Sequence, residues 1–300
     1  MTPQVAAIIL ANDIAEAIFP DNSFIRKAIN DDAFIMGKKV QLPQSGALPN
    51  VTKNRTAYPI TVAQRGDTLV EYDIDEYSTD ATHLQYTEGL VAPYNKASSI
   101  IRDHTEQLNT RLTESVAFNW SPTAAGNIVR TSGIDRPAIA PGATGTRKKI
   151  KREDIIGLRR LMDKADIPQQ GRCLLVNAEM FNDLLEDTNL LTMFLMGQAL
   201  QATAELSKLF GFEVNMRSSA LRYSTALAPK DFGAANVATD NAGCLAWHPS
   251  FVRSAVGGVK AFITPEQAVY QGDLFSALAL VGSKWRYTDG RGVYALVETA

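Results

Sequence analysis

The segment "DIIGLRRLMDKADIPQQGRCLLVNAEMFNDLLED", from Asp154 to Asp187, changes its hydrophobic period twice. Its first part repeats apolar residues every three or four positions, which predicts an amphipathic helix that ends before Pro168 and Gly171. The short run "RCLLVN" follows and predicts a buried strand. A second helical stripe begins at Met180. The segment therefore predicts a helix, a strand and a helix in series, as expected in an α+β fold.

Most of the sequence after this unit has the composition of strands. A helical stretch is first expected from Leu190 to Phe210, ending at Gly211. Strands are then expected at "FEVNMRS", "GCLAWHP" and "VKAFITP". The last two β-rich runs, residues 276–288 and 292–299, are joined by "DGRG", which predicts a closing hairpin.

The sequence before this unit begins with a stretch that predicts a short helix from Thr2 to Phe19, with an apolar face that needs a partner. From Lys38 onward Pro and Gly are frequent and the hydrophobic period shortens to two. The segment "YPITVAQRGDTLVEYDIDEY", residues 58–77, predicts two strands that form a hairpin around "QRGD". Only one parity of its second strand is apolar and the other is acidic, so we expect this hairpin to project from the body.

The longest segment without Gly or Pro runs from Tyr94 to Trp120 and carries a helical apolar stripe. At 1.5 Å per residue this predicts a helix of roughly 40 Å, which is long for a globular domain and is typical of a spine. Residues 121–151 are rich in Gly, Pro, Ser and Thr, and they are the best candidate for a domain boundary.

Composition limits the class of protein. The 300 residues are 45% hydrophobic, enough for one elaborated domain or two ordinary ones, and the formal charge is −2. Cys173 and Cys244 lie in separate apolar runs, so we expect buried thiols and no disulfide. The first residues lack a signal-peptide pattern and the longest apolar run near them, "VAAIIL", is too short to span a bilayer. We therefore expect a soluble, cytoplasmic chain.

Motifs for catalysis, cofactors and metals are not found in the sequence. "GATGTRK" lacks the spacing of a phosphate-binding loop, and no serine lies in a nucleophile elbow. The three histidines, His83, His104 and His248, have no partner at metal-ligand spacing. We interpret His104 as a helix-packing residue and His248 as a strand-end residue. The sequence thus predicts no enzyme site, no cofactor and no metal.

Two charge clusters of opposite sign are candidates for contacts between identical copies. They are complementary in charge, which favours binding of the acidic strand of one copy to the basic region of another. Alternatively the acidic strand is a solvated edge that discourages strand pairing. The basic run has no interleaved aromatic residues, which weakens a nucleic-acid site. The candidate contact residues are Glu71, Asp73, Asp75, Glu76, Arg147, Lys148, Lys149, Lys151 and Arg152.

The order of these elements resembles that of the major capsid proteins of tailed bacteriophages, whose fold is shared with the floor of the herpesvirus shell. The resemblance rests on "REDIIGLRRLMDKADIPQQGRCLLVNAEMFNDLLED", "LFGFEVNMRS", "GCLAWHPSFVRSAV" and "LVGSKWRYTDGRGVYALVET". These segments are similar to the A-domain unit, the turn that follows a helix, the strand with its "HP", and the terminal strands of that family.

The resemblance implies a division of the chain: an N-terminal arm over 1–45, an E-loop hairpin over 46–88, the spine helix and P-domain over 89–151, an A-domain over 152–262, and P-domain return strands over 263–300. It also implies pentamers and hexamers of an icosahedral, DNA-containing phage head, assembled in the host cytoplasm. The implied partners are copies of itself, a portal protein, packaged DNA and, in some relatives, scaffolding and decoration proteins. Some relatives cross-link an E-loop lysine to an asparagine, but no motif here places a partner for Lys53.

Two further functions stay open at this stage. An α+β enzyme could assemble its site from residues distant in sequence, and a concave pocket with perturbed titratable groups would favour it. A nucleic-acid-binding module could use the basic run, and salt-dependent binding by the single subunit would favour that. The leading hypothesis is a self-assembling protein, because an arm, a hairpin and a long helix cannot all bury their apolar faces in one compact body.

Overall fold

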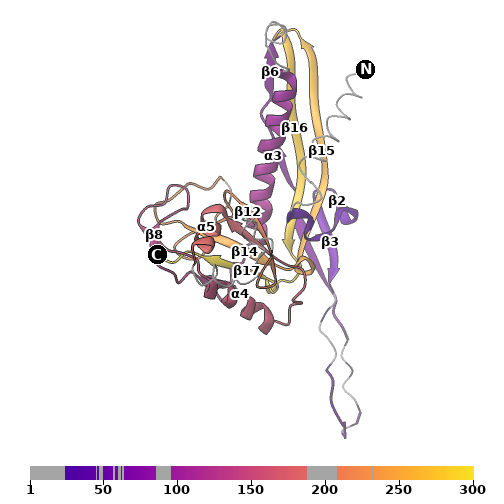
Figure 1. Cartoon of the computed structure of the whole chain (residues 1–300). Helices are drawn as coiled ribbons and strands as arrows, with labels where there is room; N and C mark the ends of the chain where they lie inside the picture. Colours follow the sequence, from indigo (N-terminus) through magenta and orange to yellow (C-terminus); the bar gives the residue numbers. More distant parts are fainter. Residues whose placement is uncertain are drawn as a thin grey trace.

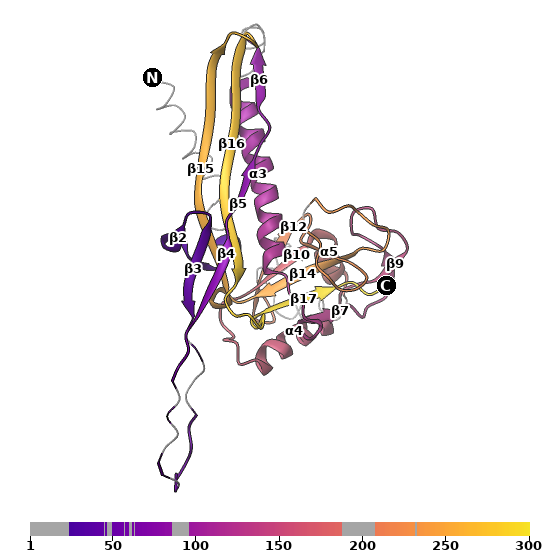
Figure 2. The ribbon, with the colours of Figure 1, turned by 180° about the vertical axis from the view of Figure 1, so that it is seen from behind.

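The computed structural model describes residues 24–300 except 45, 47–49, 57, 60–61, 63, 86–95, 188–207 and 232. The helix expected over Thr2–Phe19 lies outside the described residues. Figures 1 and 2 show a body of packed helices and strands from which a long hairpin rises at one end and a thin loop extends at the other.

The rising part is a β-hairpin of two long strands, β15 (Val252–Gln267) and β16 (Gly272–Trp285). They pair antiparallel from Val252 opposite Trp285 to Gln267 opposite Gly272. Three short strands complete this sheet: β1 (Ile29–Asn30) at the outer edge of β15, and β5 (Asp75–Ser78) and β6 (Thr82–Gln85) along β16.

A long helix, α3 (Lys96–Trp120), packs along one face of this hairpin, as Figure 1 shows. The sequence explains the helix, because the segment contains neither Gly nor Pro and carries the spaced ion pairs Arg102–Glu106 and Arg111–Glu114. Its large buried apolar side chains lie on one stripe: Ile100, Leu108, Leu112, Val116 and Trp120. Twenty-five residues correspond to about 37 Å of helix, so the predicted long helix is confirmed.

A small sheet at the root of the hairpin corrects the first predicted hairpin. Strand β4 (Thr68–Asp73) pairs with β3 (Lys39–Gln44), and β2 (Ile35–Met36) adds to β3, so the described partner of β4 lies earlier in the chain than predicted. The reason is apolar complementarity, since Val40 and Leu42 in β3 pack with Tyr72 in a buried cluster. The second predicted strand therefore lies in a core, and the part that projects is the connection before it.

The body is built on a second sheet of seven strands. Its central strand β10 (Arg172–Asn177) is buried along its whole length, pairing parallel with β12 and antiparallel with β14. The other strands are β7 (Ile128–Arg130), β11 (Lys208–Leu209), β12 (Phe212–Arg217), β13 (Leu221–Tyr223), β14 (Asn241–Trp247) and β17 (Val293–Val297). A separate two-stranded sheet, β8 (Asp135–Pro137) with β9 (Thr146–Lys148), lies beside it.

Two predictions in this region are wrong. The runs joined by "DGRG" do not pair, because β16 pairs with β15 and β17 pairs with β14 and β7 of the second sheet. Both runs are β-rich, but the apolar side chains of β17 are buried on both faces, which requires a central position in a sheet. The helix expected to end at Phe210 has Lys208 and Leu209 in strand β11, and its residues up to 207 lie outside the described ones.

The predicted helix–strand–helix unit is confirmed as α4 (Arg152–Lys164), β10 and α5 (Ala178–Glu186). Asp154 stabilises the start of α4, since its carboxylate accepts the backbone N–H of Lys151 at 3.1 Å. Asn177 caps α5 by accepting the N–H of Glu179. Short 3-10 helices lie at Phe24–Arg26, Asp32–Phe34, Ala125–Asn127 and Pro249–Phe251.

Aromatic side chains join the long helix to the second sheet. Phe24 packs edge-on against Trp120 of α3 and against Trp247 of β14, with ring centroids 6.1 and 5.9 Å apart. The Trp247 indole N–H donates to the carbonyl of Lys27 at 2.9 Å. Residues from the start of the described chain, the long helix and the second sheet therefore share one core.

Candidate assembly surfaces

The connection between β3 and β4 extends away from the body as a thin loop, at the end of the molecule opposite the tip of the long hairpin (Figures 1 and 2). Its large apolar side chains are exposed: Val51 by 91%, Tyr58 by 74% and Val62 by 94%. Lys53 and Asn54 form a turn in it, and Asn54 has a φ of 51°. A loop of this kind leaves apolar surface uncovered in the single chain.

The predicted acidic residues lie on β4 and β5, and three of the four are close to lysines of the same chain. Lys39 lies 3.8 Å from Glu71 and 3.9 Å from Asp73, and Lys38 lies 3.3 Å from Glu76. Asp75 differs, because partial burial and then the nearby Asp73 raise the pKa of its carboxyl. The structure thus brings Lys38 and Lys39 to this cluster, which the sequence prediction did not include.

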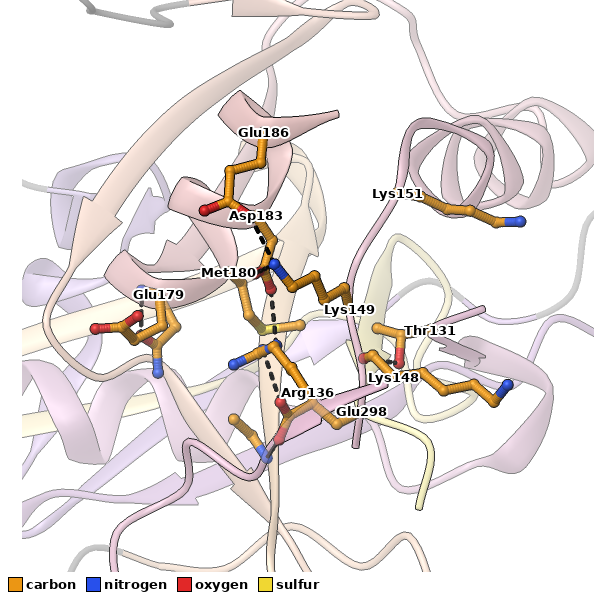
Figure 3. Close-up of polar contacts among 12 residues, drawn as sticks. Thr131, Arg136, Lys148, Lys149, Lys151, Glu179, Met180, Asp183, Glu186 and Glu298 are labelled. Carbon is orange, nitrogen blue, oxygen red and sulfur yellow. Dashed lines mark hydrogen bonds and ion pairs between the residues drawn. The ribbon is translucent and has the colours of Figure 1, made fainter. Parts of the chain in front are cut away.

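The predicted basic run divides into inward and outward side chains. Arg147 is buried and donates to the Asn241 side chain at 2.7 Å, so its guanidinium is directed into its own subunit. Lys149 forms ion pairs with Asp183 and Glu186 of its own chain. Figure 3 shows Lys148 and Lys151 directed away from that group.

Arg152 begins α4, and its guanidinium lies 5.9 Å from the ring centre of Phe210. Its backbone N–H donates to the Asp187 carboxylate at 3.1 Å. Lys151 lies 3.9 Å from Glu153, a weak exposed pair. The structure therefore leaves Lys148 and Lys151 as the basic residues of the run best placed for contact with a neighbour.

A buried charge cluster that the sequence did not predict lies behind these lysines (Figure 3). The Arg136 guanidinium lies 2.7 Å from Glu298 and 2.9 Å from Asp183, and the second contact is an ion pair without hydrogen-bond geometry. Glu298 also accepts the backbone N–H of Ala242 at 2.9 Å. Burial raises the pKa of the Asp183 and Glu298 carboxyls, and Arg136 opposes that shift in both. The cluster joins β8, α5 and the end of β17.

A signal for this cluster was present in the sequence. Asp183 lies between Met180 and Leu184 on the apolar stripe of α5, where a solvated carboxylate is not expected. Glu298 directly follows the fully buried strand β17. Two carboxylates in apolar surroundings need a buried cation to balance their charge. The sequence could not identify this cation as Arg136, because Arg136 lies in a stretch that is loop-like in composition.

His104, His248 and the two cysteines are held by packing and hydrogen bonds within the subunit. His248 caps the 3-10 helix that follows β14 by accepting the N–H of Ser250, as expected for a strand-end residue. His104 lies on α3 and packs against Thr79, with its Nδ1 2.8 Å from the threonine hydroxyl. Both cysteines are buried and free, and burial raises the pKa of the Cys173 thiol to about 11. Thiols in this state are poor nucleophiles at neutral pH.

Within the described parts of the chain, every helix is too short or too polar to cross a bilayer. The described His, Cys, Asp and Glu side chains form no group of three or more that could hold a metal ion.

Comparison with known proteins gives a structural match and no sequence match. No family model matches the sequence. No curated protein matches it either. The capsid structure of the cyanophage P-SCSP1u superposes with a TM-score of 0.64 at 16% identity, covering 90% of this chain and 86% of that chain. The capsid of Ralstonia phage GP4 gives 0.62 at 10% identity, covering 93% and 88%. The chain has the phage capsid fold.

The capsid fold accounts for nearly the whole chain. The mature capsid of bacteriophage PhiM1 also matches, with a TM-score of 0.60 at 13% identity over 93% of this chain and 87% of that one. The mixed helix and sheet class expected from the sequence is confirmed, together with the capsid fold that the resemblance indicated. At these identities the likeness concerns the fold, and the role of individual residues has to be argued from the chain itself.

Proposed function

We propose that this chain is a major capsid protein, a structural protein whose copies assemble into pentamers and hexamers of an icosahedral phage head that contains DNA. The observation that supports this most directly is the capsid fold, which covers about nine-tenths of both chains in the comparisons. A virion location follows from the same proposal, with assembly in the host cytoplasm. The role is structural rather than enzymatic.

The projecting loop supplies the physical reason for assembly. Val51, Tyr58 and Val62 are largely exposed on a thin extension, outside the buried clusters of the described residues. Burial of apolar surface is worth about 25 cal/mol per Å², so covering these side chains with a neighbour is favourable. Repeated contacts of this kind between identical copies produce a closed symmetric particle.

We also propose how the capsid segments map onto the elements. The N-terminal arm, 1–45, and the E-loop, 46–88, keep the bounds that the resemblance implies. The spine helix is α3, and the P-domain comprises it with β15 and β16. The A-domain is built on the seven-stranded sheet, which β7 and β17 complete. In this division the P-domain strands begin at Val252, where β15 starts.

In this proposal, only some of the charged candidate residues form contacts between copies. Glu71, Asp73 and Glu76 have exposed lysine neighbours that water can replace, so they can exchange partners with another copy. Lys148 and Lys151 are the basic side chains offered to them. Packaged DNA by non-specific contact, a portal protein, and scaffolding or decoration proteins are further proposed partners.

Electron microscopy of the concentrated, purified full chain tests the proposal, together with analytical ultracentrifugation over a concentration series. Closed shells or capsomer rings, with sedimentation that depends on concentration, are the expected results. A monomer that stays monomeric at all concentrations, with or without co-expressed phage proteins, would overturn it.

Limited trypsin digestion adds a local readout of the same assembly. Lys53 and Arg65 are exposed on the projecting loop and are open to the protease in the single chain. We expect rapid cleavage there in dissociated protein and protection in particles. Equal cleavage in both states would contradict a role of the loop in assembly.

A further inference from the structure

A groove lies between the N-terminal half of α3 and the strands β5 and β6, on the part of the molecule that carries the long hairpin. Its volume is about 650 Å³, within the range of binding pockets. Buried Ile100 and Leu108 contribute an apolar surface to its lining. Its charged side chains are three carboxylates and one guanidinium: Glu76, Asp80, Asp103 and Arg111. The lining therefore combines an excess of negative charge with an apolar surface.

The charged residues of the groove differ in whether a partner in the same chain balances their charge. Arg111 forms an ion pair within its own helix, and Glu76 has the exposed Lys38 at 3.3 Å. Asp80 and Asp103 are exposed, and neither forms an ion pair with any other described residue. The negative charge is thus least balanced at the end of the groove where Asp80 and Asp103 lie.

His104 lines the same groove, and its hydrogen bonds fix which ring nitrogen carries the proton. The Thr79 hydroxyl accepts the backbone N–H of Ala277 at 3.0 Å and donates its single proton to the Ala277 carbonyl at 3.4 Å. Its 2.8 Å contact with His104 Nδ1 therefore has the ring N–H as donor. Nε2 keeps a lone pair, is buried, and has no hydrogen-bond partner among the described groups. Burial lowers the pKa of His104 and so favours the neutral ring, which adds an unmet acceptor to the carboxylates.

The acceptors are spread along the groove rather than gathered at one point. Glu76 and Asp80 lie on one extended segment that follows β16, so four residues separate them by roughly 13 Å. Among the described residues, no group of His, Cys, Asp and Glu is close enough to hold a metal ion. A flexible linear molecule with a cation at each end can reach both carboxylates while its methylene groups cover the apolar surface between them.

We infer that this groove binds a linear aliphatic diamine or polyamine, with one ammonium group between Asp80, Asp103 and His104 Nε2. A second ammonium group reaches Glu76 at the other end. An ammonium group has three N–H donors and no acceptor, which matches an unmet lone pair beside two carboxylates. The methylene chain removes apolar surface from water. This binding goes beyond the proposed function and does not require assembly, because every lining residue belongs to one subunit.

Titration calorimetry of the dissociated full chain with two α,ω-diamines tests the site. Diaminooctane and diaminopropane carry the same charge, but only the longer molecule can span the groove. We expect one diaminooctane to bind per chain, at least about tenfold more tightly than diaminopropane. Equal affinity for the two diamines, or no saturable binding, would show that the carboxylates only attract counterions, and the inference would be overturned.

Substitutions at the two ends of the groove test the placement of the ligand. D80N/D103N should weaken diaminooctane binding about tenfold. E76Q should weaken it about threefold and reduce the preference for the longer diamine, and this single change keeps the test valid if the double variant is unstable. E106Q/E179Q is the matched control, because it removes two exposed carboxylates outside the groove, one of them on α3, and should leave the affinity unchanged. An equal loss in the control would contradict a specific site.

The imidazole of His104 gives a readout that net charge alone would not change. Nitrogen NMR distinguishes a ring nitrogen with a lone pair from one that carries a proton. Saturation with diaminooctane should shift the lone-pair resonance of Nε2, because that atom then accepts a hydrogen bond. A resonance that stays in place would overturn the inference. None of these measurements uses particle formation, so the inference and the proposed function fail separately.

Discussion

The chain contains two groups of ion pairs that differ in their surroundings. In the first, Arg136 joins Asp183 and Glu298, and these side chains are 8%, 7% and 0% exposed. In the second, Lys39 faces Glu71 and Asp73 across β3 and β4, and the lysine side chain is 55% exposed. Distances reflect the difference, because the buried pairs are 2.7–2.9 Å and the exposed ones 3.8–3.9 Å.

This difference in burial distinguishes the charges that stabilise the subunit from the charges that can bind another copy. Removing one member of a buried pair leaves an uncompensated charge in a medium of low polarity. An exposed pair is solvated and contributes little to folding. We therefore expect the Arg136 cluster to fix the body of the subunit and the acidic strand to remain exchangeable at its surface.

Replacing Arg136 by methionine should have the largest effect. The change keeps most of the side-chain volume but leaves Asp183 and Glu298 without their shared cation, at a cost of about 3–5 kcal/mol in the free energy of unfolding. Urea unfolding of the dissociated subunit, followed by tryptophan fluorescence, measures the loss. A loss under about 1 kcal/mol would show that the cluster is solvated and that the comparison with the exposed pairs is mistaken.

Glu298→Gln should change how the stability of the subunit depends on pH, because it removes one titrating carboxyl of the buried cluster. Burial raises the pKa of Glu298 above its ordinary value, so the folded state binds its proton more tightly than the unfolded state does. The stability that this group contributes is complete below the unfolded pKa and is lost as pH rises through the folded pKa. The wild type should therefore lose more stability than E298Q as the pH rises above the ordinary carboxyl range of about 4.

The difference between the two unfolding curves over that pH range isolates Glu298, because the other shifted carboxyls are common to both proteins. Asp183 faces Arg136, Lys149 and Glu186 in both and keeps its own raised pKa. Parallel curves for the wild type and E298Q would contradict the assigned burial.

Asp154→Ala should have an intermediate effect. Its carboxylate accepts the backbone N–H groups of Lys151 and Ser132, both at 3.1 Å, and so joins the start of α4 to the strand region before it. Loss of a helix-capping carboxylate costs about 0.5–2 kcal/mol. Thermal unfolding followed by circular dichroism measures it, and Asp154→Asn, which keeps an acceptor oxygen, should recover part of the loss.

The sequence predicted the elements whose partners are local. In α3 and in the unit α4–β10–α5, helical stripes and a short apolar run are read within one segment, and the structure confirms them. Strand pairing was predicted less well, because it depends on residues far apart in the chain. The acidic strand β4 pairs with Lys39–Gln44, and β17 lies in a different sheet from β16. A turn motif such as "DGRG" predicts that the chain reverses direction, but it does not predict which strand pairs with each of the two strands that it connects.

The candidate surfaces were predicted by residue type but not by direction. The basic run appeared as one cluster in the sequence, whereas the strand period turns Arg147 inward and Lys148 outward. Lys149 then turns toward α5, whose acids lie more than thirty residues away in the chain. The groove beside α3 could not be predicted, because it forms between a helix and two strands that pair with β16, distant in sequence.

Lys39→Met should have the smallest effect on folding, because it removes the cation of the exposed pairs rather than of the buried ones. Lys39 is more than half exposed and lies beyond hydrogen-bond distance from both carboxylates, so its loss should cost less than about 1 kcal/mol of unfolding free energy. Assembly should respond differently, because Glu71 and Asp73 then carry a charge that only a neighbouring copy can match. We expect a stronger dependence of particle yield on salt than in the wild type. A variant that loses several kcal/mol would place Lys39 among the charges that stabilise the fold. Unchanged salt dependence of assembly would show that the acidic strand does not face a neighbouring copy.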